Sequence, residues 1–445
     1  MIFNIPNYVD RIINKLEEKG YEAYIVGGSV RDKLIGREPH DYDINTNALP
    51  EEIVEVFKEY KTLEIGKKFG TIVVVQNEGI VEVTTFRSDG EYIDGRRPEE
   101  VYFSKELKDD LSRRDFTINA MAYNKNMGLI DYFDGRGYLK HKLIKTVGDP
   151  QERFKEDYLR VIRAIRFATE LEFFIEDETY KACKDYSQHL SHISIERIRD
   201  EFFKILLVRH PSYGIRLLKD TGILDVILPE IIKSVGFNQH NSHHNKDVFE
   251  HTLAVLDNTS PILHLRLAAL FHDIAKPHTF TLDDDGTGHF YGHDKIGANM
   301  AREILKRWKA PNDLIDKVYI LIDKHMTQHD NFKDKGLKRL IAKVGEEEIF
   351  TLLELQKADR ISSNGESSIE DLLDRENKIE DILNNEEVYE KKQLALDGND
   401  VIELGYKQGK LIGKILDYLL EQVLESPELN NKEKLIGIIK DKFEL

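Results

Sequence analysis

The amino-acid sequence predicts an α+β fold in which a mixed sheet near the N-terminus is followed by an all-helical remainder. Short apolar runs typical of strands occur at residues 24–26, 70–75 and 80–86. Later segments, such as 154–168, carry apolar residues at helical spacing instead. A third observation is the segment 24–45, in which a strand, a glycine pair, a helix start and a second strand follow one another. This order is typical of a ligand site built on a mixed sheet.

Composition limits the class of protein. The chain has 445 residues, of which 40% are hydrophobic, so it can bury the cores of several domains. Its formal charge of −17 gives no bulk indication of nucleic-acid binding, so an RNA partner would need local basic patches. The single cysteine, Cys183, excludes an intramolecular disulfide and a Cys-x-x-Cys zinc site. No signal segment or membrane-length apolar run is present, so we expect a cytoplasmic protein without a membrane partner.

The segment 24–45 contains the first candidate site residues. Gly27 and Gly28 follow a strand directly, and without a Cβ their backbone N–H groups can approach a phosphate closely. Asp41 and Asp43 lie two apart on an expected strand, so both carboxylates face one side. Such a pair repels unless a cation lies between the two groups, and Mg²⁺ prefers oxygen ligands. These residues therefore predict a metal-dependent site for a nucleoside triphosphate.

The whole pattern, GGxVRDxLxGxxxxDxD, resembles the signature of the class II tRNA nucleotidyltransferase and poly(A) polymerase family. Either short motif alone would be weak evidence, but their conjunction at this spacing favours the family. The resemblance implies a nucleotidyltransferase-type mixed-sheet head. It also implies that Asp41 and Asp43 hold Mg²⁺, and that Gly27, Gly28 and Arg31 bind the triphosphate.

The remaining elements of the head follow in order. An amphipathic helix is expected over 8–20, and another begins at Pro50. Glu82 lies in the strand 80–86. The family places a third carboxylate on the equivalent strand, which implies a catalytic role for Glu82, whereas a solvent-facing glutamate is the alternative reading.

Residues 87–98, RSDGEYIDGRRP, predict a surface loop, and loops on a rigid scaffold often carry function. The stretch resembles the flexible loop of the family. Its charged residues Asp94, Arg96 and Arg97 argue, through that resemblance, for the ability to add A.

Arg113, Arg114 and Asp115 precede an apolar stretch that we expect to be helical. Two arginines at a helix start suit a triphosphate. RRDFTINA resembles a family motif. The resemblance implies that Arg114 contacts phosphate and that Asp115 is either part of the nucleotide site or a structural partner.

The segment FKEDYLRVIRAIRFA predicts one helix with charged residues on a broad face. A salt-bridged helix is the ordinary interpretation, although Asp and Arg also match the acceptors and donors of base edges. The EDxxR motif resembles the amino-acid template by which the family selects CTP or ATP. The resemblance implies that Glu156, Asp157 and Arg160 read the base, and that Arg163 and Arg166 reach the nucleotide.

Histidine is enriched between residues 236 and 295. We expect His251 on one helix and His272 with Asp273 on an apolar helix, while Asp359 follows later. Mixtures of imidazole and carboxylate bind catalytic divalent metals. The pattern resembles the HD phosphohydrolase domain. The alternative is a degenerate HD fold that is kept for packing alone. The resemblance implies that His251, His272, Asp273 and Asp359 hold a divalent transition metal or Mg²⁺, with His293 and His325 at a second metal or a phosphate.

The expected domains are a head at 1–147, a helical neck and body at 148–235, an HD domain at 236–375 and a helical tail at 376–445. The tail resembles the tRNA-contacting part of the family. Lys407, Lys410 and Lys414 are candidate phosphate contacts there, although a solvated face explains them equally well.

The resemblance implies template-independent addition of C, C and A to the tRNA 3′ end from CTP and ATP. An A-adding enzyme or a poly(A) polymerase shares the same head and is the first alternative. The second is an HD phosphohydrolase whose head binds RNA. A non-enzymatic RNA scaffold is disfavoured because both metal sites look complete. The sequence leaves open the number of nucleotides added, the metal and substrate of the HD domain, and the oligomeric state.

Overall fold

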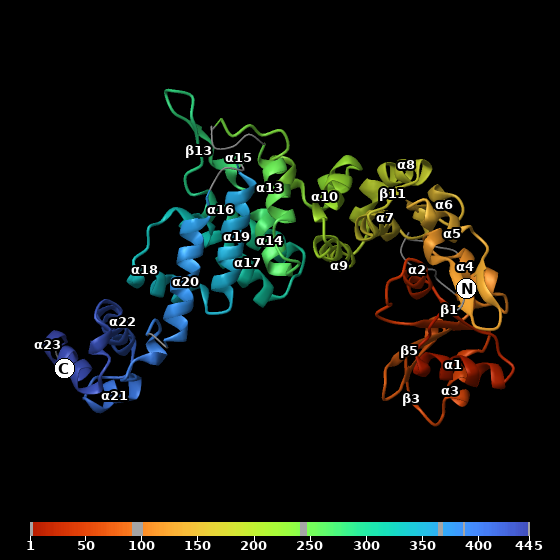
Figure 1. Cartoon of the computed structure of the whole chain (residues 1–445), viewed down its shortest axis with the longest axis horizontal. Helices are drawn as coiled ribbons and strands as arrows, with labels where there is room; N and C mark the ends of the chain where they lie inside the picture. Colours follow the sequence, from red (N-terminus) through yellow and green to blue (C-terminus); the bar gives the residue numbers. More distant parts are fainter. Residues whose placement is uncertain (1–2, 91–100, 241–246, 364–367, 386–387, 444–445) are drawn as a thin grey trace. The chain divides into compact units, whose positions relative to one another are not determined.

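The computed structural model describes residues 3–90, 101–240, 247–363, 368–385 and 388–443 (Figure 1). The chain forms two compact units, Met1–Pro229 and Glu230–Leu445. The loop residues Asp94, Arg96 and Arg97 lie outside the described residues.

The first unit is built on a seven-stranded sheet with the strand order β3-β4-β5-β2-β1-β8-β9. Strands β2 and β5 pair parallel, whereas the other neighbouring pairs of this sheet are antiparallel. The expectation of a mixed-sheet head is therefore confirmed. The strands are β1 (Ala23–Val26), β2 (Asp43–Thr46), β3 (Lys61–Gly66), β4 (Thr71–Val75), β5 (Ile80–Thr85), β8 (Met121–Asn124) and β9 (Gly128–Asp131).

Five helices accompany the sheet, and Figure 1 shows α1 and α3 close to its strands. The expected helix over 8–20 is α1, which buries Val9, Ile12, Ile13 and Leu16 at helical spacing. The expected helix at Pro50 is α3, with proline in its first turn. The helices of the head are α1 (Asn7–Glu18), α2 (Gly28–Leu34), α3 (Pro50–Val56), α4 (Leu107–Ser112) and α5 (Gly135–Lys140).

Short elements complete this part of the chain. They are the strand pairs β6 (Arg87–Asp89) with β7 (Val101–Phe103) and β10 (Leu143–Ile144) with β11 (Phe174–Ile175), and the 3₁₀ turns η1 (Lys67–Phe69) and η2 (Thr117–Asn119).

Two expectations about helices are wrong. The apolar stretch after Arg114 is not a helix, because it forms η2 and then strand β8. Strand β8 is buried along its whole length and pairs with a strand on each side, so sheet pairing decides its conformation. The segment 154–168 is not one helix either: α6 (Pro150–Glu156) and α7 (Leu159–Leu171) are separated at Asp157, whose φ of −145° and ψ of 105° are extended.

The rest of the first unit is helical, as expected for a neck and body. Its helices are α8 (Asp177–Tyr186), α9 (Ile195–Leu206), α10 (Pro211–Asp220) and α11 (Ile223–Ile227), with the 3₁₀ segment η3 (Ser187–His192) between α8 and α9.

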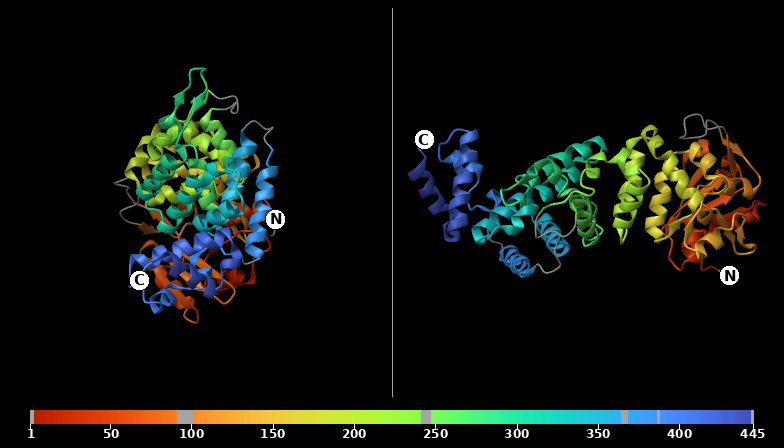
Figure 2. Two further views of the ribbon diagram at one scale, coloured as in Figure 1. Left: turned by 90° about the vertical axis from the view of Figure 1, so that its left-hand side faces the viewer. Right: turned by 90° about the horizontal axis from the view of Figure 1, so that it is seen from above.

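The second unit is almost entirely helical, which two further views make plain (Figure 2). A short hairpin, β12 (Thr281–Leu282) and β13 (Gly288–His289), interrupts the helices. No helix among the described residues is both long enough and apolar enough to cross a membrane. The elements are α12 (Pro229–Ile232), α13 (Val248–Asp257), α14 (Leu263–Phe271), α15 (Lys276–Thr279), α16 (His293–Arg307), α17 (Asn312–Lys324), η4 (His325–His329), α18 (Asp334–Val344), α19 (Glu348–Ser362), α20 (Glu370–Asn384), η5 (Lys391–Gln393), α21 (Gly398–Glu403), α22 (Lys410–Glu425), η6 (Pro427–Leu429) and α23 (Lys432–Lys442).

Candidate functional sites

Three carboxylates gather at one place on the head sheet. Asp43 opens β2, and its registered neighbour on β5 is Glu82, so the two side chains share a face of the sheet. Asp41 is exposed and lies in the loop just before β2, so the expectation that one strand carries both aspartates is wrong in this detail. Burial raises the pKa of Asp43 to about 6; Arg114 opposes this rise, and Glu82 and Asp41 add to it by repulsion. A bound cation would relieve that repulsion.

Gly27 and Arg114 are held together beside these carboxylates. Gly27 has a φ of +75°, which favours glycine, and it immediately precedes α2. A Cβ at this position would lie only 2.7 Å from Nη1 of Arg114. The absence of a side chain at Gly27 therefore allows the guanidinium to approach both the glycine pair and Asp43.

We expect Gly27→Ala to destabilise the protein by about 1–3 kcal/mol, because it introduces both backbone strain and a collision with Arg114. Gly28→Ala is the matched control, since its Cβ would meet Nη2 of Arg31 at an ordinary 3.6 Å. Thermal unfolding of the two variants measures the difference. Equal melting temperatures would contradict this account of the glycine pair.

Asp110, which the sequence analysis did not single out, orients the arginines of the RRD motif. Its side chain is fully buried and accepts hydrogen bonds from Nδ2 of Asn45 at 2.5 Å and Nη2 of Arg113 at 2.7 Å. Nη2 of Arg114 lies 3.6 Å from the same carboxylate. Burial alone would raise the pKa of Asp110, but Arg113 and Arg114 lower it below its usual value. The i, i+3 and i, i+4 spacing to the two arginines was the available signal.

Arg31 and Asp115 are both buried and fully engaged within the protein. Arg31 donates from Nη1 to Oδ1 of Asn119 at 2.9 Å and from Nε to Oδ1 of Asp32 at 2.9 Å. Asp115 accepts from the N–H of Phe116 at 2.8 Å and from Nε of Arg163 on α7 at 2.9 Å. Burial would raise the pKa of Asp115, yet the contact with Arg163 helps to lower it to about 2. Asp115 thus joins the head to α7 as a structural partner.

Arg163 and Arg166 are also bound within the protein. In addition to Asp115, Nη1 of Arg163 lies 3.7 Å from Glu201 on α9. Arg166 pairs with Glu201 at 2.6 Å and with Glu170 at 2.5 Å. Its guanidinium also lies 3.6 Å from the centre of the Phe167 ring. These arginines fix α7 against the head and α9, and direct contact with the nucleotide stays a prediction for both.

The residues of the EDxxR motif lie at the break between α6 and α7. Nη1 of Arg160 is 2.5 Å from Glu156 and donates to the carbonyl of Arg153 at 3.1 Å. Asp157 is instead bound by Arg197 from α9, at 2.8 Å between Nη2 and Oδ2. Arg197 was missed because it lies 40 residues away in the chain, and no local spacing indicates it.

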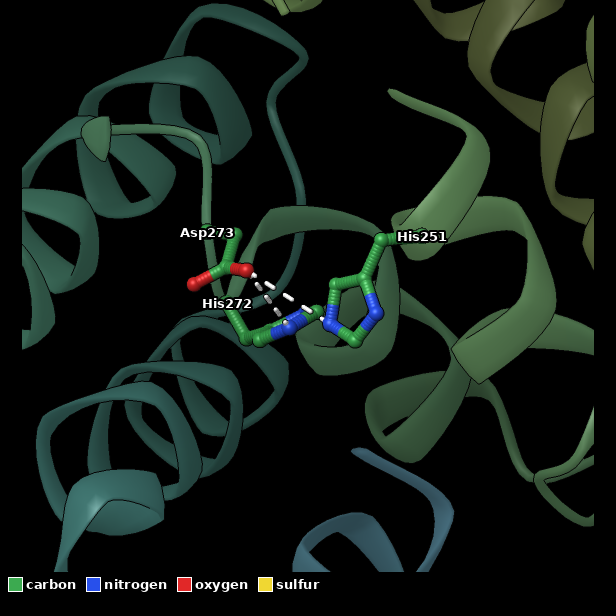
Figure 3. Close-up of side chains that lie close together, drawn as sticks. All are labelled: His251, His272 and Asp273. Atoms are coloured by element: carbon green, nitrogen blue, oxygen red, sulfur yellow. Dashed lines mark ion pairs between the residues drawn. The ribbon is translucent and has the colours of Figure 1, made fainter. Parts of the chain in front are cut away.

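The second unit brings together all six predicted His and Asp residues, and each of them is buried. His272 and Asp273 lie just after α14 rather than within it, while His293 opens α16 and His325 opens η4. Two sets of possible metal ligands each have donor atoms within 4.8 Å of one another, and Asp273 belongs to both. Figure 3 shows the set of His251, His272 and Asp273. The sets are His251, His272 and Asp273, and Asp273, His293 and His325. Asp359 on α19 adjoins the first set, with Oδ1 3.0 Å from Nε2 of His251.

Three of these histidines share one hydrogen-bonding arrangement. Nδ1 of His272, His293 and His325 lies 2.7 to 2.8 Å from the backbone carbonyl three residues earlier in each case. A carbonyl only accepts, so each Nδ1 carries a proton, and Nε2 is the ring nitrogen that remains to bind a metal. Burial, with His293 and His272 nearby, lowers the pKa of His325 to about 3, so this ring is neutral. Imidazoles oriented by a backbone carbonyl are typical of metal ligands.

A cavity of about 610 Å³ opens beside this cluster. Asp273, His293 and Asp359 are among its lining residues, and Lys276 and Arg360 supply positive charge. Nζ of Lys276 is 2.8 Å from Oδ2 of Asp273. The cavity could therefore admit an anionic molecule to the cluster.

Comparison with known proteins gives three family matches along the chain. Residues 23–145 match the "Poly A polymerase head domain", and residues 172–234 match the "Probable RNA and SrmB- binding site of polymerase A". Residues 293–439 match domain 2 of tRNA nucleotidyltransferase. The last match begins inside the region where an HD domain was expected, and the HD assignment itself stays a prediction.

Several relatives are similar over nearly the whole chain. The CCA-adding enzyme of Levilactobacillus brevis is 33% identical over 97% of this chain and 96% of its own length. The CCA-adding enzyme of a Geobacillus species is 35% identical over 95% of this chain and 94% of its own length. The CCA-adding enzyme of Staphylococcus haemolyticus is 48% identical over 50% of this chain and 55% of its own length. The crystal structure of the Bacillus stearothermophilus CCA-adding enzyme in complex with CTP matches 99% of this chain and 98% of that one, with a TM-score of 0.74 and 28% identity.

Proposed function

The chain belongs to the family of CCA-adding enzymes, and from this membership we propose that it adds C, C and A in turn to the tRNA 3′ end. CTP and ATP are the nucleotide substrates. The observation that carries the proposal is the similarity over the whole chain, together with the intact head residues and the EDxxR motif. An enzyme that adds only A, or a long A tail, is the alternative. The lengths of the products formed on tRNA transcripts ending before CCA or in CC separate the two.

The carboxylates of the head fit Mg²⁺. Asp43 and Glu82 are oxygen donors on one face of the sheet, and Asp41 lies just before β2. Burial raises the pKa of Asp43, and repulsion from Glu82 and Asp41 adds to this rise, as expected of a site built for a cation. We propose that Asp41 and Asp43 hold the metal and that Glu82 assists them. Bound Mg²⁺ would favour ionisation of the terminal 3′-hydroxyl and offset triphosphate charge. Arg114, which Asp110 holds beside Gly27, supplies the fixed positive charge for the phosphates.

Base selection follows from the different chemistry of Asp157 and Arg160. On their Watson–Crick edges, cytosine and adenine each present an amine donor next to a ring-nitrogen acceptor. Uracil and guanine present a carbonyl next to an N–H, which is the reverse order. A carboxylate only accepts and a guanidinium only donates, so this pair suits C and A together and opposes U and G. Glu156, through its 2.5 Å contact, orients Arg160.

Asp157→Asn tests this assignment. An amide both donates and accepts, so discrimination of CTP against UTP should fall about 10- to 100-fold. The measurement is competitive incorporation into a tRNA transcript that lacks its CCA end. Unchanged discrimination would show that Asp157 does not read the base.

A second function is favoured by the buried cluster in the second unit. We propose that His251, His272, Asp273 and Asp359 hold one divalent metal and that Asp273, His293 and His325 hold another. The shared carboxylate and the buried Nε2 atoms of His272, His293 and His325 support this proposal. A transition metal suits the imidazole-rich set better than Mg²⁺ does. With metal, such a site catalyses hydrolysis of phosphate esters.

Hydrolysis of p-nitrophenyl phosphate and of bis-p-nitrophenyl phosphate, before and after treatment with a chelator, measures this second activity. We expect activity that the chelator removes and that added Mn²⁺, Co²⁺ or Ni²⁺ restores. If no metal restores hydrolysis of either ester, the cluster has a packing role.

A further inference from the structure

Contacts from two different helices hold the side chain of Asp157 in place. It lies in the extended break between α6 and α7, where the first residue of α7 and Arg197 of α9 bind its carboxylate. Its Oδ1 accepts the backbone N–H of Leu159 at 3.0 Å, and Nη1 of Arg197 lies 3.5 Å away. Its Oδ2 accepts from Nη2 of Arg197 at 2.8 Å. Arg197 therefore contacts both carboxylate oxygens. Oδ1 also has the N–H of Leu159, whereas Arg197 is the partner of Oδ2 among the described residues.

We infer that Arg197 is a positioning residue for base selection: it fixes the orientation of the Asp157 carboxylate and thereby helps to exclude UTP and GTP. This inference rests on the proposed reading of the base by Asp157 and Arg160. If Arg197 is removed, the remaining hydrogen bond from Leu159 constrains one oxygen only. The carboxylate can then rotate out of line with Arg160, and the fixed acceptor–donor order is lost.

The contrast with Arg160 supports this role. The guanidinium of Arg160 is held by Glu156 and by the backbone carbonyl of Arg153. Its Nη2 also donates to the backbone carbonyl of Arg113 at 2.9 Å. Both base-reading side chains are thus oriented, but by different elements. Arg160 is held from α6 and the RRD segment, whereas Asp157 is held from α9.

Helix α9 is well placed to act as the support. Arg197 and Glu201 lie four residues apart on α9 and so occupy neighbouring positions on one face. Glu201 pairs with Arg166 at 2.6 Å and approaches Arg163, which fixes α9 against α7. The planar guanidinium fork of arginine can contact two carboxylate oxygens at once, which a lysine ammonium cannot match geometrically.

The test compares Arg197→Gln and Arg197→Lys with the control Arg199→Gln, whose native arginine pairs with the exposed Asp200 on the same helix. Each variant is given tRNA transcripts and competing CTP with UTP, or ATP with GTP. We expect Arg197→Gln to lower discrimination about 10- to 100-fold and to raise the KM for CTP and ATP about tenfold, with kcat at saturation nearly unchanged. Arg197→Lys should recover part of the discrimination, and Arg199→Gln should resemble the native protein.

A double variant separates a positioning role from a merely structural one. If Arg197 acts through Asp157, then Asp157→Asn with Arg197→Gln should discriminate no worse than Asp157→Asn alone. Additive losses, or a lower kcat with unchanged discrimination and KM, would overturn the inference. If Arg197→Gln does not fold, Arg197→Lys decides: reduced discrimination supports the inference and native discrimination overturns it. Failure of the native protein to add C and A would instead refute the proposed function.

Discussion

Asp43→Asn is expected to reduce nucleotide addition at least about 1,000-fold, because it removes a carboxylate from the proposed metal site of the head. The same substitution should stabilise the metal-free protein at neutral pH. Asn is uncharged and similar in shape, so it removes the cost of burying an ionised carboxylate, and the repulsion from Glu82 and Asp41, without leaving a cavity. A loss of activity with a gain in stability is the signature of a functional carboxylate rather than a structural one.

The pH dependence of this stabilisation has a definite sign. The pKa of Asp43 is about 6 in the folded protein and 3.8 without the fold, so the folded state holds the proton more tightly. Ionised Asp43 therefore opposes folding. Its cost in the free energy of unfolding grows between pH 4 and pH 6 and reaches up to about 3 kcal/mol above pH 6. Below pH 4 the native protein and the variant should be equally stable.

Urea unfolding in the presence of a chelator, at pH 4 and at pH 7.5, measures this difference. Glu64→Gln is the control, because Glu64 is an exposed acid on strand β3 of the same sheet. Its carboxylate pairs with Lys67. The control should change neither stability nor addition appreciably. An Asp43→Asn variant that adds nucleotides at the native rate would refute the assignment of the head site.

Asp273→Asn is expected to abolish metal binding in the second unit, because Asp273 belongs to both sets of ligands. Metal content should fall from two ions per chain to none. Hydrolysis of p-nitrophenyl esters should fall at least about 1,000-fold, whereas CCA addition should stay within about twofold. Elemental analysis of the purified protein gives the metal content directly.

Asp313→Asn is the matched control, since Asp313 is an exposed acid on α17, and its Oδ2 lies 3.9 Å from Nζ of Lys317. It should retain metal and hydrolysis. If Asp273→Asn retains both metal ions, Asp273 is not the shared ligand, and if it loses CCA addition, the two activities are not separate.

The sequence predicted the parts of the site that depend on local pattern. Gly27, Asp43 and Glu82 were found from a short strand, a glycine pair and the family motif, and the parallel pairing of β2 with β5 brings the two acids together. The histidines of the second unit were found from their composition, and the fold gathers them although 108 residues separate His251 from Asp359.

The remaining features depend on tertiary contacts. Residues 121–124 have a helical pattern in isolation, but pairing with β1 and β9 makes them a strand. The apolar spacing of 154–168 continues through Asp157, so periodicity does not show the break between two helices at this residue. Arg197 reaches Asp157 only because α9 packs beside α7, and a single sequence contains no signal for such a contact.

The proposed addition of CCA is measured with two labelled tRNA transcripts, one ending before CCA and one ending in CC. Each is incubated with Mg²⁺ and CTP, ATP or both, and product length is resolved to one nucleotide. We predict that the first transcript grows by three nucleotides only when both substrates are present, and that the second grows by one A with ATP alone. Extension of only the CC-ended transcript, or a long ladder of A, would contradict the assignment as a CCA-adding enzyme.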